Sequence, residues 1–383
     1  MRSNSRSRAV LLLAGGASVV IVIGLGLALL RPAPKVPPAV SPTPAFQPAP
    51  TPRPTQATIA LDIADELKLG PHAVNAMAVE PGVVWLATQG VTAGAAGTLL
   101  RVDASPVHTA ASWSIGGDPV AVAAAGDFVW VANGVGVGSG SVSEPNTVEQ
   151  FNVATGALTH RYTVLDPRGL VANPTTALVI STAAGQQTAI TLLTDGNEKL
   201  VTTLPGTLNA PVSSLSPEVA VAVCSNEAYL ALTNLFTSGS SVTIYALPQS
   251  GGTAHQVVTI LDDYEASMTC NTSSLFLIGA AGDGDVSVAR VTIADGGITN
   301  LWEGPYPVAV AFLSGRVWIA YADASLNQSV LTSLDPGTGL AAPVRSILPV
   351  APTDPNGSLL IPGDSGLWVV ASQGNLLLHV ATS

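Results

Sequence analysis

The sequence predicts an all-β fold, a seven-bladed β-propeller, on three observations. A short apolar phrase recurs seven times, its residues are typical of buried strands, and its last copy lacks one strand that an N-terminal segment can supply. Successive copies are 42 to 50 residues apart, a period typical of propellers and solenoids. The clearest copy reads Val-Trp-Val-Ala, and the residues at the tryptophan position are Trp85, Trp130, Val179, Tyr229, Phe276, Trp318 and Trp368.

Each copy of the phrase predicts the second strand of a blade. It is apolar on both faces, as a strand between two packed sheets must be. The strands before it are small and apolar, as at residues 120–123, 219–222 and 308–311, and we expect them nearest the axis. The strands after it alternate better, as at residues 147–153, which favours an outer strand with one wet face. Turns are expected at residues 154–156, 195–197, 295–297 and 335–339.

The two ends of the domain are predicted to close the ring together. The seventh copy offers three strands, at residues 357–362, 367–372 and 375–381. A strand-like segment at residues 58–63 precedes the first copy and would supply the missing outer strand, which removes an exposed edge. The alternative fold is one β-sandwich or two.

The N-terminal 56 residues predict a membrane anchor and a stalk. Residues 1–8 contain Arg2, Arg6 and Arg8, and residues 9–30 are uncharged and mostly apolar, which is long enough for a transmembrane helix. Basic residues before the helix predict a single-pass cell-membrane protein with a cytoplasmic N-terminus and an extracytoplasmic C-terminal domain. A cleaved signal peptide is the alternative.

Residues 31–56 form a proline-rich linker, and the propeller is expected to occupy residues 57–383. An extended polyproline II stalk of this length would span up to roughly 80 Å. A proline-rich ligand for a partner is the other interpretation of this segment.

The charge distribution argues against one class of partner. The protein has a net charge of −11, and the propeller contains all 25 acidic residues but only eight of the 14 basic ones, which gives it a charge of −17. Nucleic acid and anionic lipid surfaces are therefore not expected as partners. The acidic surface either serves solubility or attracts cations and basic partners.

The two cysteines, Cys224 and Cys270, are expected near the ends of neighbouring inner strands. A disulfide between them suits an exported domain, and two buried free thiols are the alternative. The five histidines are scattered, and those in outer-strand or turn stretches are expected to be solvated. No metal site and no nucleophile motif is predicted from these residues.

Acidic and tyrosyl residues are expected to gather around one mouth of the axial channel. They lie in loops that enter the innermost strands, and such loops meet at one face of a propeller. Mouths of closed β-folds are common ligand sites, although aspartate is also an ordinary turn residue. The candidate binding residues are Asp118, Asp166, Arg168, Asp262, Asp263, Tyr264 and Tyr306.

The repeat resembles the YVTN-type or virginiamycin B lyase-like bacterial propellers, which are WD40-like in architecture. The likeness is carried by residues 306–311, 316–320 and 334–339, and again by residues 118–134 and 151–156. Lyases of this group use a histidine with acidic residues and magnesium on one face. No matching His and Glu pair stands in the corresponding loops here, so the resemblance assigns no catalytic residue.

The sequence therefore predicts a membrane-anchored binding or scaffold module for a protein, peptide or cell-envelope component. The alternative is a metal-assisted lyase or hydrolase at the acidic mouth, with Ca²⁺ or Mg²⁺ bound there. A third hypothesis is a structural partner in an envelope complex.

Overall fold

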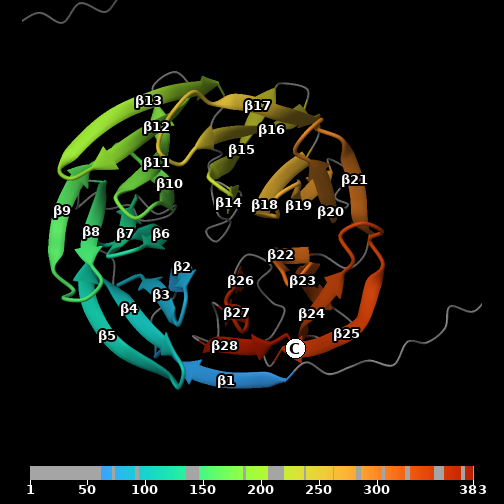
Figure 1. Ribbon diagram of the computed structural model, residues 1–383, viewed down its shortest axis with the longest axis horizontal. Coiled ribbons are helices and arrows are strands. Elements are labelled where there is room, and N and C mark those ends of the chain that lie inside the picture. Colours follow the sequence, from blue (N-terminus) through green and yellow to red (C-terminus); the bar gives the residue numbers. More distant parts are fainter. Residues whose placement is uncertain are drawn as a thin grey trace, which may run out of the picture. The chain divides into compact units, whose positions relative to one another are not determined.

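The computed structural model describes residues 62–70, 74–90, 95–134, 146–183, 187–205, 220–236, 239–261, 263–281, 286–303, 307–323, 328–348, 358–371 and 376–382. In this part of the chain the regular structure is entirely β. Its strands form seven antiparallel sheets of four strands each, which confirms the predicted seven-bladed propeller (Figure 1).

Six of the blades are built from four consecutive strands. Blade 1 contains β2 (Val74–Glu80), β3 (Val83–Thr88), β4 (Gly97–Ala104) and β5 (Val107–Ile115). Blade 2 contains β6 (Pro119–Ala125), β7 (Phe128–Asn133), β8 (Thr147–Asn152) and β9 (Leu158–Thr163). Blade 3 contains β10 (Pro167–Ala172), β11 (Thr176–Ala183), β12 (Gln187–Thr194) and β13 (Asn197–Pro205).

The next three blades repeat this order. Blade 4 contains β14 (Ala220–Cys224), β15 (Glu227–Phe236), β16 (Gly239–Pro248) and β17 (His255–Leu261). Blade 5 contains β18 (Asp263–Cys270), β19 (Ser274–Ala281), β20 (Val286–Thr292) and β21 (Ile298–Glu303). Blade 6 contains β22 (Pro307–Leu313), β23 (Arg316–Asp323), β24 (Gln328–Leu334) and β25 (Ala341–Leu348).

Blade 7 joins the two ends of the propeller. Its strands are β26 (Ser358–Pro362), β27 (Gly366–Ala371), β28 (Leu376–Ala381) and, outermost, the N-terminal β1 (Ile63–Lys68). The prediction that an N-terminal strand closes the ring is correct, but the strand was placed too early, at residues 58–63. The closing strand turns only Ile63 and Leu67 toward the cores, and its remaining residues are exposed because it is an outermost strand.

The innermost strands and the second strands follow the predicted repeat. Figure 1 shows the first strand of each blade toward the centre of the ring, and consecutive first strands contact one another around it. All seven residues at the tryptophan position lie in second strands, and none is more than 4% exposed. Burial at this position supplies the contact between adjacent blades, as in the two clusters around Trp85 and Trp130.

The third strand of blade 2 corrects one expectation. Residues 147–153 were predicted to have a wet face, yet Thr147 to Phe151 are buried in β8. Neighbouring blades cover the third strand on both faces, so its polar residues need partners inside the protein. Exposure begins at the fourth strand, as the pattern of β9 shows.

The predicted turns are found where expected between third and fourth strands. Gly156, Gly196, Gly296 and Gly339 all have positive φ, between 68° and 77°, a conformation that glycine adopts without a steric penalty. In the described ranges, no helix is long and apolar enough to cross a membrane. The predicted anchor at 9–30 and linker at 31–56 lie outside the described residues.

Candidate functional site

The propeller has two rims with different chemistry. We call the rim formed by the loops that lead into first strands the entry rim; its described loops include residues 116–118 and 164–166. We call the rim formed by the turns between first and second strands the turn rim; it includes residues 126–127, 225–226, 271–273, 314–315 and 363–365. The predicted site residues that the structure describes lie at the entry rim or at the start of the first strands next to it.

The structure describes three of the predicted site residues fully. Asp118 and Asp166 lie in loops that enter β6 and β10, and Arg168 is the second residue of β10. Asp263 and Tyr264 begin β18, with side chains outside the described part, and Asp262 and Tyr306 lie outside the described residues. Whether these four join a common site stays a prediction.

Asp118 ties two blades together at the entry rim. Its Oδ1 accepts a hydrogen bond from Nε2 of Gln89, which follows β3 of blade 1, at 2.6 Å. Its backbone carbonyl accepts a bond from the amide of Gly134, which follows β7, at 2.9 Å. The carboxylate is therefore held in place at the joint between blades 1 and 2.

Asp166 and Arg168 form an ion pair at the entrance of blade 3. Arg168 Nη2 lies 2.8 Å from Asp166 Oδ1, and Thr182 Oγ1 donates to Asp166 Oδ2 at 2.6 Å. Asp166 has a φ of 46°, an uncommon conformation for a residue other than glycine. Arg168 stands where the register of β10 and β11 shifts. Opposite charges are thus fixed side by side on the rim.

Leu165, next to this ion pair, is an exposed apolar residue. It is 69% exposed, whereas the side chains of Asp166 and Arg168 are 21% and 14% exposed. The 164–166 loop therefore presents an apolar group beside two immobilised charges.

Sequence reasoning missed a buried carboxylate beneath the entry rim. Glu149 in β8 is 1% exposed. It accepts hydrogen bonds from the amide of Gly116 at 3.0 Å, from Asn133 Nδ2 at 3.1 Å and from Arg161 Nε at 3.0 Å. Arg161 also forms an ion pair with it. The one signal in the sequence is a glutamate in the third strand of blade 2. The alternating pattern of that strand instead predicts a solvent-exposed face.

The network around Glu149 joins blades and does not leave the carboxylate free. Gly116 belongs to the loop after blade 1, and the other donors belong to blade 2. A buried charge is tolerated where it is paired and hydrogen-bonded. Losing one partner should therefore be costly, and we interpret the network as a structural clamp.

No group of three His, Cys, Asp or Glu side chains in the described ranges is placed to hold a metal ion. Both fully described carboxylates of the predicted mouth are already bonded to side chains of the protein. Ca²⁺ or Mg²⁺ at the mouth stays a prediction that depends on residues outside the described part.

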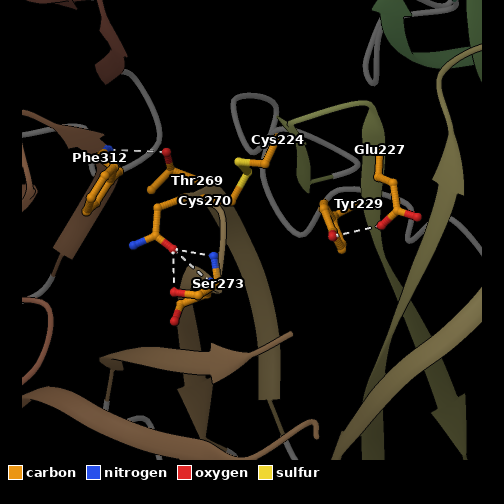
Figure 2. The surroundings of a disulfide bond; sticks show 9 residues. Cys224, Glu227, Tyr229, Thr269, Cys270, Ser273 and Phe312 are labelled. Carbon is orange, nitrogen blue, oxygen red and sulfur yellow. Dashed lines mark hydrogen bonds between the residues drawn. A yellow bond between two sulfur atoms is a disulfide. The ribbon is translucent and has the colours of Figure 1, made fainter. Parts of the chain in front are cut away.

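A disulfide links blades 4 and 5 at the turn rim. Cys224 ends β14 and Cys270 ends β18, and their sulfur atoms are bonded with the Cα atoms 6.1 Å apart (Figure 2). This separation lies within the usual range for disulfides. Of the two sequence interpretations, the structure contains the bonded pair.

Tyr229 and Glu227 lie near this disulfide on β15. Figure 2 shows the phenol of Tyr229 directed at Glu227, and its OH donates to Glu227 Oε2 at 2.9 Å. Burial of the phenol, followed by this hydrogen bond and the carboxylate charge, raises the pKa of Tyr229 to about 12. The proton that forms the bond is therefore retained well above the ordinary tyrosine range.

Neither a protein-family model nor a curated protein sequence matches this chain. A chain of hydrazine synthase from Kuenenia stuttgartiensis is similar in structure, with a TM-score of 0.59 at 12% identity, over 83% of this chain and 97% of that chain. The propeller domain of the Trilobed protease from Pyrococcus furiosus has a TM-score of 0.51 at 9% identity, over 82% and 96%. Hsv2 from Kluyveromyces lactis has a TM-score of 0.50 at 10% identity, over 79% and 90%.

These likenesses show the fold alone, because all identities are low. The Pyrococcus furiosus domain is described as having an open velcro topology. In the present chain β1 pairs with β28 from Ile63↔Val380 to Lys68↔Leu376, with a register shift between Ile63 and Asp65, so the last blade combines strands from both ends of the propeller.

Proposed function

We propose that this protein is an exported, membrane-anchored propeller whose entry rim binds a protein, peptide or cell-envelope component. The observation that carries the binding role is the 164–166 loop, where exposed Leu165 stands beside the fixed Asp166–Arg168 ion pair. A preorganised polar pair next to an apolar group loses little conformational entropy when a partner binds.

The disulfide supports the exported location. Disulfides persist in oxidising compartments and are rare where glutathione and thioredoxin keep thiols reduced. Cys224 and Cys270 account for both cysteines of the chain. The apolar segment 9–30 and the proline-rich segment 31–56 would then anchor and extend the domain, and the resemblance of the repeat to YVTN-type propellers fits a bacterial surface.

The negative charge of the propeller limits the classes of molecule that can be its partner. A domain with all 25 acidic residues and eight basic ones repels nucleic acid and anionic surfaces. The entry rim offers carboxylates, a guanidinium and an apolar side chain, so we expect a neutral or basic protein or peptide surface as the partner.

A photo-crosslinking experiment tests the binding role. A photoreactive amino acid replaces Leu165 in the full chain, expressed in its own cell envelope. The control places the same group at Leu340, which is 66% exposed in the turn between β24 and β25, on the opposite rim. We expect a discrete crosslinked product from position 165 that is absent at position 340.

Two results would contradict the proposal. Position 165 could yield no product, or positions 165 and 340 could yield the same set of products, as random collisions would. In the variant with the photoreactive group at position 165, an additional Arg168→Ala change should reduce the yield of crosslinked product severalfold, because it breaks the fixed ion pair. An unchanged yield would show that these two charges do not contribute to binding.

A further inference from the structure

In the closing blade, a serine side chain contacts a histidine, and that histidine in turn lies close to an aspartate. Ser365 Oγ lies 3.1 Å from His379 Nε2. His379 Nδ1 lies 3.8 Å from Asp65 Oδ2. The nucleophile, the base and the group that orients the base have this same connectivity in serine hydrolases of unrelated fold, which are recognised by geometry and not by order along the chain.

The way the ring closes brings these residues together. Asp65 in β1 pairs directly with His379 in β28, and His379 pairs with Trp368 in β27. Residues opposite each other on paired strands share one face of the sheet. Ser365 comes from the turn between β26 and β27, so all of these residues meet at the turn rim.

His379 is held as a fixed base and not as a solvated side chain. It is 7% exposed. Its ring stacks on the indole of Trp368 with centroids 4.5 Å apart and planes 17° apart. Only glycine fits at position 366, because a Cβ there would lie 2.2 Å from the Val380 carbonyl oxygen and 3.1 Å from His379 Nε2.

The hydrogen bonds available to the imidazole of His379 favour the tautomer protonated on Nδ1, which leaves Nε2 free to act as a general base. When Ser365 donates its hydroxyl proton to Nε2, the ring carries its own proton on Nδ1. That atom is buried, has no hydrogen-bond partner in the described part of the chain, and lies 3.8 Å from Asp65 Oδ2. Catalytic hydrogen bonds are often long in unliganded enzymes and shorten when substrate binds.

We propose that this group is a second functional site, a serine esterase centre in which Ser365 is the nucleophile and His379 the general base. Asp65 is a positioning residue that acts through His379. The site lies on the turn rim and is independent of the binding role assigned to the entry rim.

The reaction has two balanced steps. Ser365 Oγ attacks the ester carbonyl carbon as its proton passes to His379 Nε2; the carbon–alkoxy bond then breaks, and the alcohol leaves with that proton. Water attacks the acyl-serine while Nε2 takes its proton. The carboxylic acid leaves, and Oγ recovers the proton. No oxidant, reductant or metal takes part.

The surroundings define the substrate class. Ser365 is exposed on its turn, so an ester can approach from solvent. Asp364 is exposed beside it, and the side chain of Asp65 is 47% exposed. Negative charge at the site disfavours anionic esters, and we assign neutral or cationic esters.

A covalent label tests the nucleophile directly. The full chain is treated with a fluorophosphonate, and labelled peptides are identified by mass spectrometry. Ser314 is an internal control, because it is exposed in the equivalent turn between β22 and β23 and forms no hydrogen bond with a histidine in the described part. We expect label on Ser365 and at least tenfold less on Ser314; equal labelling would overturn the proposal.

Three variants test the roles with 4-nitrophenyl acetate. Ser365→Ala should abolish the initial nitrophenol burst without changing the melting temperature by more than a few degrees. Asp65→Asn, at an exposed position, should lower kcat about tenfold or more with KM unchanged, a split that a structural role would not give. His379→Gln should lose the label. Hydrolysis that persists in Ser365→Ala, or a kcat unaffected by Asp65→Asn, would leave His379 as a core histidine satisfied by Ser365.

Discussion

Trp85 and Trp130 occupy the same position in neighbouring blades, yet replacing each with phenylalanine should give different losses of stability. Both indoles are fully buried. Trp85 stacks on Trp113 at 5.6 Å, and Trp130 stacks on Tyr162 at 5.9 Å. The difference lies at the indole nitrogen. Trp85 Nε1 donates to Glu80 Oε2 at 3.1 Å, whereas Trp130 Nε1 is buried without a hydrogen-bond partner among the residues that the structure describes.

The magnitude follows from this difference. The loss of apolar contact is similar in the two variants and largely cancels in the comparison. Trp85→Phe also removes a hydrogen bond to a carboxylate, about 1.5–3 kcal/mol, partly recovered because Glu80 can be rehydrated. Trp130→Phe instead removes an unsatisfied buried donor, which costs the native protein about 1–3 kcal/mol. We expect Trp85→Phe to be more destabilising by roughly 2 kcal/mol.

Urea unfolding of the full chain, followed by tryptophan fluorescence and circular dichroism, measures the difference. With an m-value of about 3 kcal/mol/M, the midpoints of the two variants should differ by roughly 0.7 M. In a Glu80→Ala background the two substitutions should become alike. The reasoning is refuted if Trp130→Phe is as costly as Trp85→Phe, since the indole N–H of Trp130 would then have a partner.

Three further predictions concern the disulfide, the buried phenol and the rim carboxylates. Replacing Cys224 and Cys270 with serine should lower the free energy of unfolding by up to about 4 kcal/mol for a crosslink spanning 46 residues, read from urea midpoints; an unchanged midpoint would contradict it. Because the pKa of Tyr229 is raised to about 12, the folded state keeps a proton that the unfolded chain releases above pH 10. Its contribution, at most about 2.7 kcal/mol, is complete below pH 10 and lost as pH rises toward 12, so Tyr229→Phe should flatten the pH dependence of stability in that window. EDTA and added Ca²⁺ should leave melting unchanged, because Asp118 and Asp166 are bonded to protein groups; a rise with Ca²⁺ would support a metal site at the mouth.

The sequence predicted the architecture well because the contact between blades depends on a repeated local pattern. Each second strand must be apolar on both faces, so the phrase around Trp130 or Trp318 identifies its strand by composition alone. The strands of the seventh copy were placed within about one residue of β26, β27 and β28. Closure was harder, because residues 58–63 contain the alternating apolar residues Ile59, Leu61 and Ile63. The true strand Ile63–Lys68 has no such alternation and is identified only by its pairing with β28.

Polar residues were interpreted less well, because their role depends on neighbours far away in the sequence. The strand pattern of β8 predicts a solvent-facing Glu149, but the residue lies on the face packed against the preceding blade 1, and the amide of Gly116 reaches it. Asp118 and Asp166 lie in loops that enter first strands, as their place in the repeat predicts, while their bonds to Gln89 and Thr182 depend on side-chain geometry. The spacing of residues along the chain predicts neither the burial of Glu149 nor the hydrogen-bond partners of Asp118 and Asp166.

The closing strand has a consequence beyond stability. Pairing β1 with β28 places Asp65 opposite His379, two residues from opposite ends of the propeller, and the turn before β27 adds Ser365. A shift of one residue in this register would move Asp65 to the other face of the sheet and separate it from the histidine. The pairing that closes the ring is therefore also the one that assembles the proposed esterase centre, and loss of register at β1 should reduce labelling of Ser365 before it unfolds the other six blades.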